Sequence, residues 1–378
     1  MNIYHVIALA LPNSAGFKGA RVLNTLYALE LGADAFAVGL LLAMYAAFPL
    51  LLAVYAGRIA DRYGVRVPLA AGLAGMTLGV VLPHVVPTLP ALFVAAAVTG
   101  AGFIFVQISM QSLTGSLGTG EARTRYINLY ALTIATADLV GPVLAGILID
   151  SVGHVRTYAY LALLNVASLI GVASMYRRIP PAAPRSGGRE AERMMDLLKS
   201  RDLRRVFIAG ALVFTGLDVF QLYLPVYGHS AGLSASAIGM VLGAFAAAAF
   251  VTRALLPSLA RRFGEERTLI GALYVAGGAF MLMPLSADAL VLAAISFVFG
   301  LGLGLGQPLS VILTCNHAPA GRMGEALGLR IAINNVMHVI VPVTFGAAGA
   351  VIGIPPVFWS GSALLALGGY VTQRGRSR

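Results

Sequence analysis

Twelve apolar segments, most of them longer than about 20 residues, follow one another along the chain. A helix needs about 20 predominantly apolar residues to cross the hydrocarbon core of a bilayer, so each segment is long enough to span a membrane. Several connectors are only a few residues long, and neighbouring helices must therefore be antiparallel. The segments cover residues 5–29, 36–60, 67–86, 90–115, 126–149, 156–176, 206–229, 236–260, 268–286, 289–314, 325–349 and 354–373.

Composition supports a membrane protein: 58% of the residues are hydrophobic and 11% are charged, against about 25% charged in a typical soluble domain. A soluble protein of this length could not cover its surface with so few polar groups. We therefore exclude a soluble enzyme, a disordered chain and a nucleic-acid-binding protein. The single cysteine, Cys315, excludes a disulfide framework and a cysteine-cluster metal site, and we expect no metal and no cofactor.

The net charge of +11 reflects topology, because 21 of the 26 lysines and arginines lie on one side if alternate loops face the cytoplasm. This asymmetry is the positive-inside rule. With an even number of spans, it predicts that both termini are cytoplasmic. We expect a multi-pass protein of the bacterial inner membrane that is monomeric and surrounded by lipid.

One long polar stretch divides the spans six and six. It gives three predicted regions: an N-terminal six-helix bundle at 1–176, a cytoplasmic linker at 177–204 and a C-terminal six-helix bundle at 205–378. Within the linker, residues 190–200 could form a short amphipathic surface helix. No segment could hold a nucleotide-binding domain, so any pumping must draw on an ion or solute gradient.

The two halves align at a constant offset of 200 residues. A parallel repeat of two six-helix halves is a recurring plan of secondary transporters, which place the solute site at the midplane between them. The sequence thus predicts an all-α membrane protein with twelve transmembrane helices in two pseudo-symmetric bundles. The matching residues include Gly16 and Gly216, Tyr27 and Tyr227, Gly32 and Gly232, Gly100 and Gly300, Gln107 and Gln307, Pro142 and Pro342, and Gly146 and Gly346.

The second connector reads Gly57-Arg-Ile-Ala-Asp61-Arg62-Tyr-Gly64-Val-Arg66. It resembles the signature loop between helices 2 and 3 of the major facilitator superfamily. The resemblance implies the twelve-helix fold of that superfamily and a gating role for Gly57, Asp61, Arg62, Gly64 and Arg66, in which the aspartate pairs with arginine or caps a helix N-terminus. The second half lacks the glycine and the aspartate, since Pro257 and Arg261 replace them.

Helix 5 contains Gly141-Pro142-Val-Leu-Ala-Gly146, which resembles the fifth-helix motif of the proton-coupled exporters of that superfamily. A proline and a face of small residues allow a kink and close helix packing, so Gly141, Pro142 and Gly146 are further conformational candidates. The motif favours efflux. The arginine that drug–proton antiporters carry on helix 4 is absent, because Ala96 occupies the aligned position.

Polar side chains interrupt several spans near their centres. An ionisable group at the bilayer midplane is costly, so it normally faces the bundle interior and has a partner. Helix 1 carries Lys18, Arg21 and Asn24 on one face, and the equivalent helix 7 carries Asp218 and Gln221. Lys18 and Asp218 occupy equivalent positions, and helices 1 and 7 would face each other across the pseudo-twofold axis, so these two residues are a candidate midplane ion pair.

Helices 5 and 11 repeat this pattern with Asp138 and His338, again at equivalent positions. Histidine titrates near neutral pH, so Asp138, Asp218 and His338 are the candidate proton-coupling residues. Helix 11 adds Arg330 and Asn334. The candidate solute-binding residues are Lys18, Arg21, Asn24, Gln107, Gln111, Gln221, Gln307, Arg330 and Asn334.

These features favour a proton-coupled secondary transporter, and not an enzyme. Lys18, Arg21 and Arg330 outweigh the two aspartates, so the solute would be a small organic anion or zwitterion. An arginine would hold its anionic group, since a guanidinium is planar and stays charged. Protons would be the second partner.

Alternatives remain open at this point. A uniporter or organic-anion exchanger could use the cations for binding and the carboxylates only to balance charge. The ion pairs could be structural ties, and Gln107 and Gln307 could make packing hydrogen bonds. A membrane enzyme or a receptor is a third class, although the sequence has no metal-ligand cluster and no Gly-x-Ser-x-Gly nucleophile motif.

Overall fold

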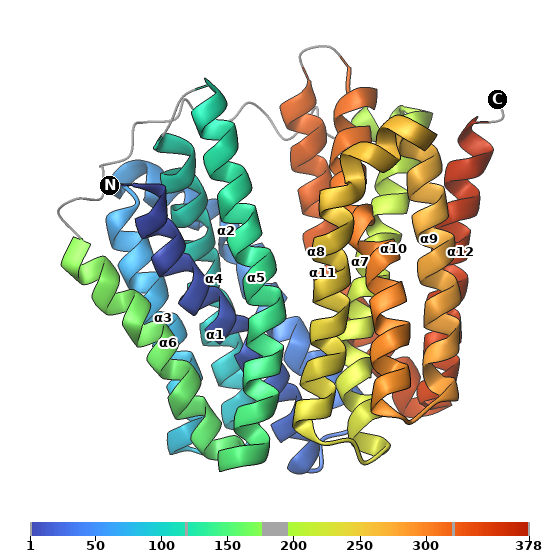
Figure 1. Ribbon diagram of the computed structural model, residues 1–378. Coiled ribbons are helices and arrows are strands. Elements are labelled where there is room, and N and C mark those ends of the chain that lie inside the picture. Colours follow the sequence, from blue (N-terminus) through green and yellow to red (C-terminus); the bar gives the residue numbers. More distant parts are fainter. Residues whose placement is uncertain (1, 118–119, 176–195, 320–321, 377–378) are drawn as a thin grey trace. The chain divides into compact units, whose positions relative to one another are not determined.

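The computed structural model describes residues 2–117, 120–175, 196–319 and 322–376 (Figure 1). Within these ranges, the side chains of residues 53–54, 57–58, 60–63, 120–121, 123–124, 323–324 and 375–376 lie outside the description. The described residues contain twelve long α-helices, and no strand occurs among them. The predicted all-α fold is confirmed.

The helices follow the predicted apolar segments closely. Eleven of them are long and apolar enough to cross a membrane; the exception is α1, whose polar residues from Pro12 to Asn24 lower its mean hydropathy. Their bounds are α1 Ile3–Glu30, α2 Ala35–Tyr63, α3 Arg66–Val85, α4 Leu89–Ser116, α5 Gly120–Val152, α6 His154–Met175, α7 Arg201–Ser230, α8 Ala235–Phe263, α9 Glu265–Leu282, α10 Ala289–His317, α11 Met323–Ile352 and α12 Ile354–Arg376.

Packing divides the chain into two compact units. Unit 1 comprises Met1–Gly187 and Ser234–Met240, and unit 2 comprises Gly188–Leu233 and Val241–Arg378. The division at residue 187 lies within the expected linker, most of which is outside the described residues; its described end, residues 196–199, forms a 3₁₀ turn. The first turns of α8 group with unit 1, because the Asp150 carboxylate on α5 accepts hydrogen bonds from the backbone N–H groups of Ala235 and Ser236.

The two units use the same packing plan. In unit 1, α1 packs on α5 and α6, and α3 packs on α4 and α6; in unit 2, α7 packs on α11 and α12, and α9 packs on α10 and α12. The turns repeat as well, since every described glycine with positive φ has its counterpart 200 residues away. These glycines are Gly32, Gly64 and Gly153, and Gly232, Gly264 and Gly353.

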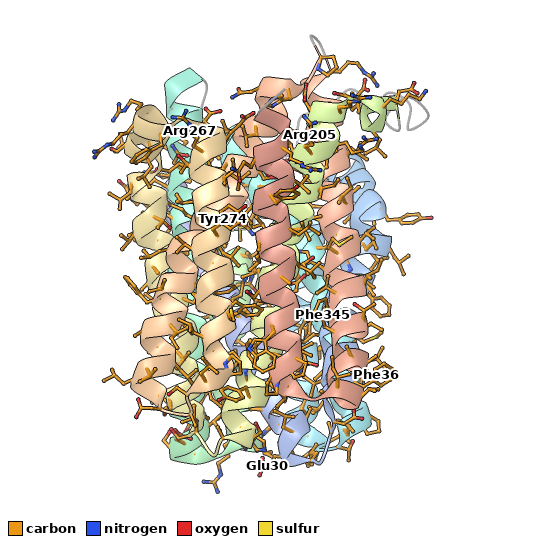
Figure 2. The ribbon with its side chains drawn as sticks, turned by 90° about the vertical axis from the view of Figure 1, so that its right-hand side faces the viewer. Glu30, Phe36, Arg205, Arg267, Tyr274 and Phe345 are labelled. Atoms are coloured by element: carbon orange, nitrogen blue, oxygen red, sulfur yellow. The ribbon has the colours of Figure 1, made fainter. Side chains whose placement is uncertain are left out.

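The surface of each unit is largely apolar, as contact with lipid requires. In unit 2, aromatic and aliphatic side chains such as Tyr274 on α9 are exposed along the helices, whereas Arg205 and Arg267 lie together at one end (Figure 2). Both arginines were expected on the cytoplasmic side. Buried aromatic rings fill the interior of unit 2, where Phe280 and Phe299 stack with their centroids 4.8 Å apart.

Candidate functional site

The interior of unit 1 holds an ion pair between α1 and α5. The Lys18 Nζ lies 2.6 Å from Asp138 Oδ1, and both side chains are partly exposed. Gly141 makes this close approach possible: a Cβ at that position would lie 2.7 Å from the Ala15 carbonyl oxygen and 2.8 Å from Lys18 Cβ. The small-residue face of helix 5 therefore brings the carboxylate to the ammonium.

The equivalent position in unit 2 also holds an acid–base pair, between α7 and α11. His338 Nδ1 lies 2.9 Å and 2.7 Å from the two carboxylate oxygens of Asp218. The Asp218 side chain is only 4% exposed, and the His338 side chain is 31% exposed. The imidazole and the carboxyl group are therefore hydrogen-bonded, and the tautomer of His338 sets which of them donates. Phe214 packs edge-on against the imidazole at 5.1 Å.

These partners differ from those expected from the sequence. We expected Lys18 to pair with Asp218 and Asp138 to face His338, because each couple occupies equivalent positions. The structure instead pairs Lys18 with Asp138 and Asp218 with His338, each inside its own unit. The physical reason is that α1 packs directly on α5, and α7 on α11.

In each pair, the residue on α5 or α11 is followed by a proline one helical turn later. Pro142 comes four residues after Asp138, and Pro342 comes four residues after His338. Proline has no N–H, so the backbone carbonyls of Asp138 and His338 have no α-helical donor. In both units the titratable side chain therefore shares its helical turn with an additional hydrogen-bond acceptor.

Of the candidate residues, two arginines lack an acidic partner among the described residues, one in each unit. Arg21 is half-buried on α1, with its guanidinium carbon 5.9 Å from the centroid of the Tyr45 ring. Arg330 is half-buried on α11, and within the described part of the chain its Nε is buried without a hydrogen-bond partner. Lys18 is paired with Asp138 and His338 with Asp218, so among the candidate residues only these two arginines are cations without an acidic partner in the described part of the chain.

Asn24, a candidate solute ligand, is buried and hydrogen-bonded to two tyrosines. It is 1% exposed, its Nδ2 donates to Tyr45 Oη at 2.7 Å, and its Oδ1 accepts from Tyr158 Oη at 2.5 Å. Both ends of the amide are therefore occupied by tyrosines. Sequence inspection did not single out Tyr45 and Tyr158. The repeat could have drawn attention to them, because the aligned residues in the second half, Phe245 and Phe358, lack the hydroxyl group.

The remaining candidates lie on the expected helices. Gln107 and Gln307 are half-buried on α4 and α10, Gln221 is half-buried one turn from Asp218, and Asn334 is buried between Arg330 and His338; Gln111 is exposed. No hydrogen bond joins any of these amides to the acid–base pairs within the described residues.

Of the gating candidates, Gly64 has φ 77° and ends α2, and Arg66 begins α3. The side chains of Gly57, Asp61 and Arg62 lie outside the described residues. Pro142 and Gly146 on α5 face the beginning of α8: a Cβ on Gly239 would lie 2.6 Å from the Pro142 carbonyl oxygen, and Gly146 lies against the Ala235 carbonyl.

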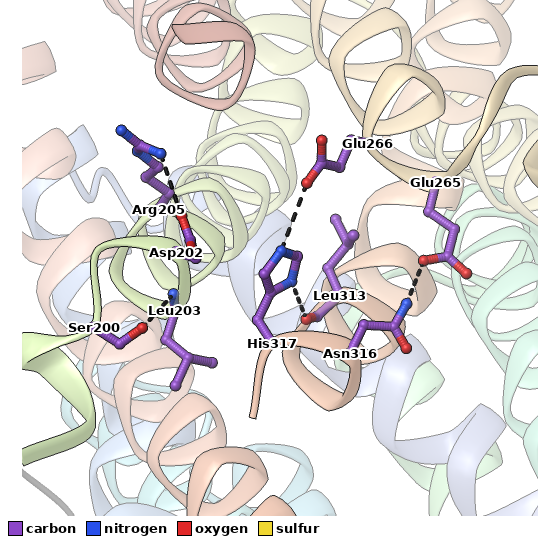
Figure 3. Close-up of polar contacts among 9 residues, drawn as sticks. All are labelled: Ser200, Asp202, Leu203, Arg205, Glu265, Glu266, Leu313, Asn316 and His317. Atoms are coloured by element: carbon purple, nitrogen blue, oxygen red, sulfur yellow. Dashed lines mark hydrogen bonds and ion pairs between the residues drawn. The ribbon is translucent and has the colours of Figure 1, made fainter. Parts of the chain in front are cut away.

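A second polar cluster lies at the end of unit 2 where α9 begins and α10 ends (Figure 3). Asn316 Nδ2 donates to Glu265 Oε2 at 2.6 Å, and His317 Nε2 lies 3.7 Å from Glu266 Oε1, so the last turn of α10 is held to the first turn of α9. Asp202 and Arg205 face each other nearby on α7. Negative charge at a helix N-terminus and positive charge at a C-terminus are both favourable.

The sequence matches the family model described as Major Facilitator Superfamily over residues 6–342. Similar curated proteins include the class G tetracycline resistance protein of Vibrio anguillarum, 25% identical over 318 residues (82% of this chain, 79% of the relative). Multidrug resistance protein 1 of Bacillus subtilis is 21% identical over 322 residues (84% and 82%).

Among solved structures, the nucleoside transporter NupG has a TM-score of 0.80 at 12% identity and covers 99% of both chains. A POT family transporter in complex with 5-aminolevulinic acid has a TM-score of 0.82 at 13% identity, covering 98% of this chain and 95% of the other. At these identities the likeness establishes the fold alone.

Proposed function

Because the chain belongs to the major facilitator superfamily, and is therefore a membrane transporter and not an enzyme, we propose that it moves a small organic anion or zwitterion by proton-coupled alternating access. The observation that carries this proposal is the arrangement of charge inside the units. Among the candidate residues inside the spans, each unit holds one acid–base pair, Lys18–Asp138 or Asp218–His338, and one arginine, Arg21 or Arg330, that has no acidic partner among the described residues.

The arginines support an anionic group on the solute. A guanidinium stays charged at all physiological pH values and binds a carboxylate or phosphate with two parallel hydrogen bonds. In a low-dielectric interior its positive charge calls for a counterion. Arg21 and Arg330 are the proposed anion ligands, with the amides of Gln107, Gln221, Gln307 and Asn334 as further polar contacts.

The acid–base pairs support proton coupling. A proton that neutralises Asp138 would release Lys18, and a proton taken up by the Asp218–His338 pair would change the charge of that pair. Asp218 is the stronger candidate for the coupling carboxylate, because its side chain is 4% exposed and contacts an imidazole, the side chain most used for proton exchange.

Export is the proposed direction. It rests on the Gly141-Pro142 motif of α5 and on relatives that are named for tetracycline and multidrug resistance. We also propose an inner-membrane location with both termini in the cytoplasm, from the distribution of the 26 lysines and arginines. The connector from Gly57 to Arg66 and the α5 motif are proposed to govern the exchange of access states.

The alternative is a uniporter or organic-anion exchanger that uses no proton. The complete Lys18–Asp138 pair favours it specifically, because a neutral pair balances charge without titrating.

Transport by purified protein in vesicles tests the proposal and the alternative together. Benzoate and tetracycline serve as the anionic and the zwitterionic probe, and benzylammonium serves as a cation of the size of benzoate. We expect a pH gradient to drive uptake of at least one of the first two and not of benzylammonium. Benzoate or tetracycline flux without any response to the gradient would support the uniporter or exchanger. Selective uptake of benzylammonium would contradict the anion assignment.

A further inference from the structure

Three buried polar side chains form a hydrogen-bonded chain in unit 1. Tyr158 on α6 donates to the carbonyl oxygen of Asn24 on α1, and the amide nitrogen of Asn24 donates to the phenol oxygen of Tyr45 on α2. All three are at most 4% exposed. Because Tyr158 occupies the Asn24 oxygen, it orients the amide so that its nitrogen faces Tyr45.

This polar chain ends beneath Arg21. The guanidinium carbon of Arg21 lies 5.9 Å from the centroid of the Tyr45 ring, within the range of a cation–π contact. The edge contact of Phe17 with that ring, at 5.7 Å, holds it from another side. The Tyr45 ring is thus held through its hydroxyl and its edge, and its face is presented to the arginine.

The internal repeat shows what the fold needs at these positions. At the constant offset of 200, Asn24 aligns with Leu224, Tyr45 with Phe245 and Tyr158 with Phe358. Unit 2 packs these residues tightly, with Leu224 1% and Phe358 0% exposed. The bundle therefore forms with apolar residues in all three places.

The two units also differ at the position of Arg21. Its aligned residue in unit 2 is Gln221, which is uncharged. Buried polar groups are costly unless all their hydrogen bonds are made, so an apolar alternative that the fold accepts would ordinarily be preferred. The polar chain occurs in the unit where a guanidinium lies above it.

We propose that Asn24, Tyr45 and Tyr158 are positioning residues that fix the Tyr45 ring under Arg21, and so orient this guanidinium toward the anionic group of the solute. Asn24 then acts through Tyr45 and does not contact the solute. The proposal rests on the proposed role of Arg21 as an anion ligand.

The test variant gives the three positions of unit 1 the residue types that unit 2 has there: Asn24→Leu, Tyr45→Phe and Tyr158→Phe together. Replacing every partner at once leaves no buried group without its hydrogen bond, so this triple variant is expected to fold. Binding of benzoate and of benzylammonium to the full-length protein is measured by calorimetry, and thermal melting reports the fold. Arg21→Gln is made alone and in combination with the triple change.

We expect benzoate affinity to fall about tenfold in the triple variant, while the melting temperature stays close to that of the unchanged protein. In the Arg21→Gln background, the triple change should weaken benzoate binding by less than about twofold, because coupled residues are not additive. Tyr223→Phe is the matched control: it removes another buried tyrosine hydroxyl, which donates to the Phe345 carbonyl, and should leave affinity unchanged.

Four outcomes would overturn the inference. Benzoate affinity unchanged in the triple variant but weakened by Arg21→Gln rejects the positioning role and leaves the proposed function intact. Losses that add fully in the combined variant, or an equal loss in Tyr223→Phe, assign the effect to general destabilisation. If Arg21→Gln itself binds benzoate normally, the proposed anion ligand fails, and the inference fails with it.

Should the triple variant melt early, Tyr158→Phe alone provides the same readout. It keeps the ring of residue 158 and removes only the donor to Asn24. A selective loss of benzoate over benzylammonium affinity supports positioning, and an unchanged affinity overturns it.

Discussion

At the scale of single residues, the two units place different bases opposite the same acid. Unit 1 pairs Asp138 with the ammonium of Lys18, whereas unit 2 pairs Asp218 with the imidazole of His338. Asp218 is also much more buried than Asp138. The two equivalent positions therefore differ both in the base and in the burial of the acid.

The first prediction concerns Asp218→Asn. The amide keeps the shape and the contact with His338 but cannot ionise, so pH-gradient-driven uptake of the transported probe should fall by about 100-fold, the order expected when a proton-transferring group is removed. Exchange without a gradient should persist. Asp34→Asn is the control, because Asp34 caps α2 and asparagine caps equally well. Full gradient dependence in both Asp218→Asn and Asp138→Asn would exclude these carboxylates from coupling.

At the scale of elements, close helix packing decides where the charged groups meet. Gly141 and Gly19 let α5 and α1 approach until backbone faces backbone, and Lys18 and Asp138 project from those contact turns. Helix packing and pair geometry are consequently linked.

Gly141→Ala should therefore weaken both the fold and the pair. The new Cβ would lie 2.7 Å from the Ala15 carbonyl oxygen, and such overpacking typically costs about 1–3 kcal/mol of stability. Thermal unfolding in detergent measures the effect. Gly271→Ala is the matched control, because nothing lies within 4 Å of its added Cβ; an exposed helical glycine gains about 0.5–1 kcal/mol on this change. Equal melting of the two variants would show that the contact is not tight.

Long apolar segments located the twelve long helices that the described residues form, because a transmembrane helix satisfies its own backbone hydrogen bonds and needs only a long apolar run. Partner choice was different. The repeat correctly marked Lys18, Asp138, Asp218 and His338 as equivalent positions, but equivalence across a repeat does not imply contact. Contact followed from which helices pack, and the sequence pattern carries no such information.

At the scale of the whole molecule, the charge distribution predicts orientation. Lys199 lies in the expected cytoplasmic linker and is exposed. Ser151 is exposed near the C-terminal end of α5, which the predicted topology places outside. In a Cys315→Ser background, Lys199→Cys should react with an impermeant maleimide only when the cytoplasmic face is accessible, and Ser151→Cys only from the outside. Reversed labelling would contradict the positive-inside assignment.

A second whole-molecule prediction is a monomeric state. Light scattering of the purified protein, corrected for bound detergent, should give a protein mass near the 39.2 kDa of one chain. A stable mass of twice that value at low protein concentration would contradict it.

The sequence by itself determined the membrane class, the helices, the twofold repeat and the identity of the costly polar residues, because length and hydropathy suffice for these in a bilayer. Only the tertiary structure decided that Lys18 pairs with Asp138, that Asp218 pairs with His338 and that Asn24 is hydrogen-bonded to Tyr45 and Tyr158. Those outcomes depend on which helices glycine allows to approach within a few ångströms, and that distance is set by packing in three dimensions.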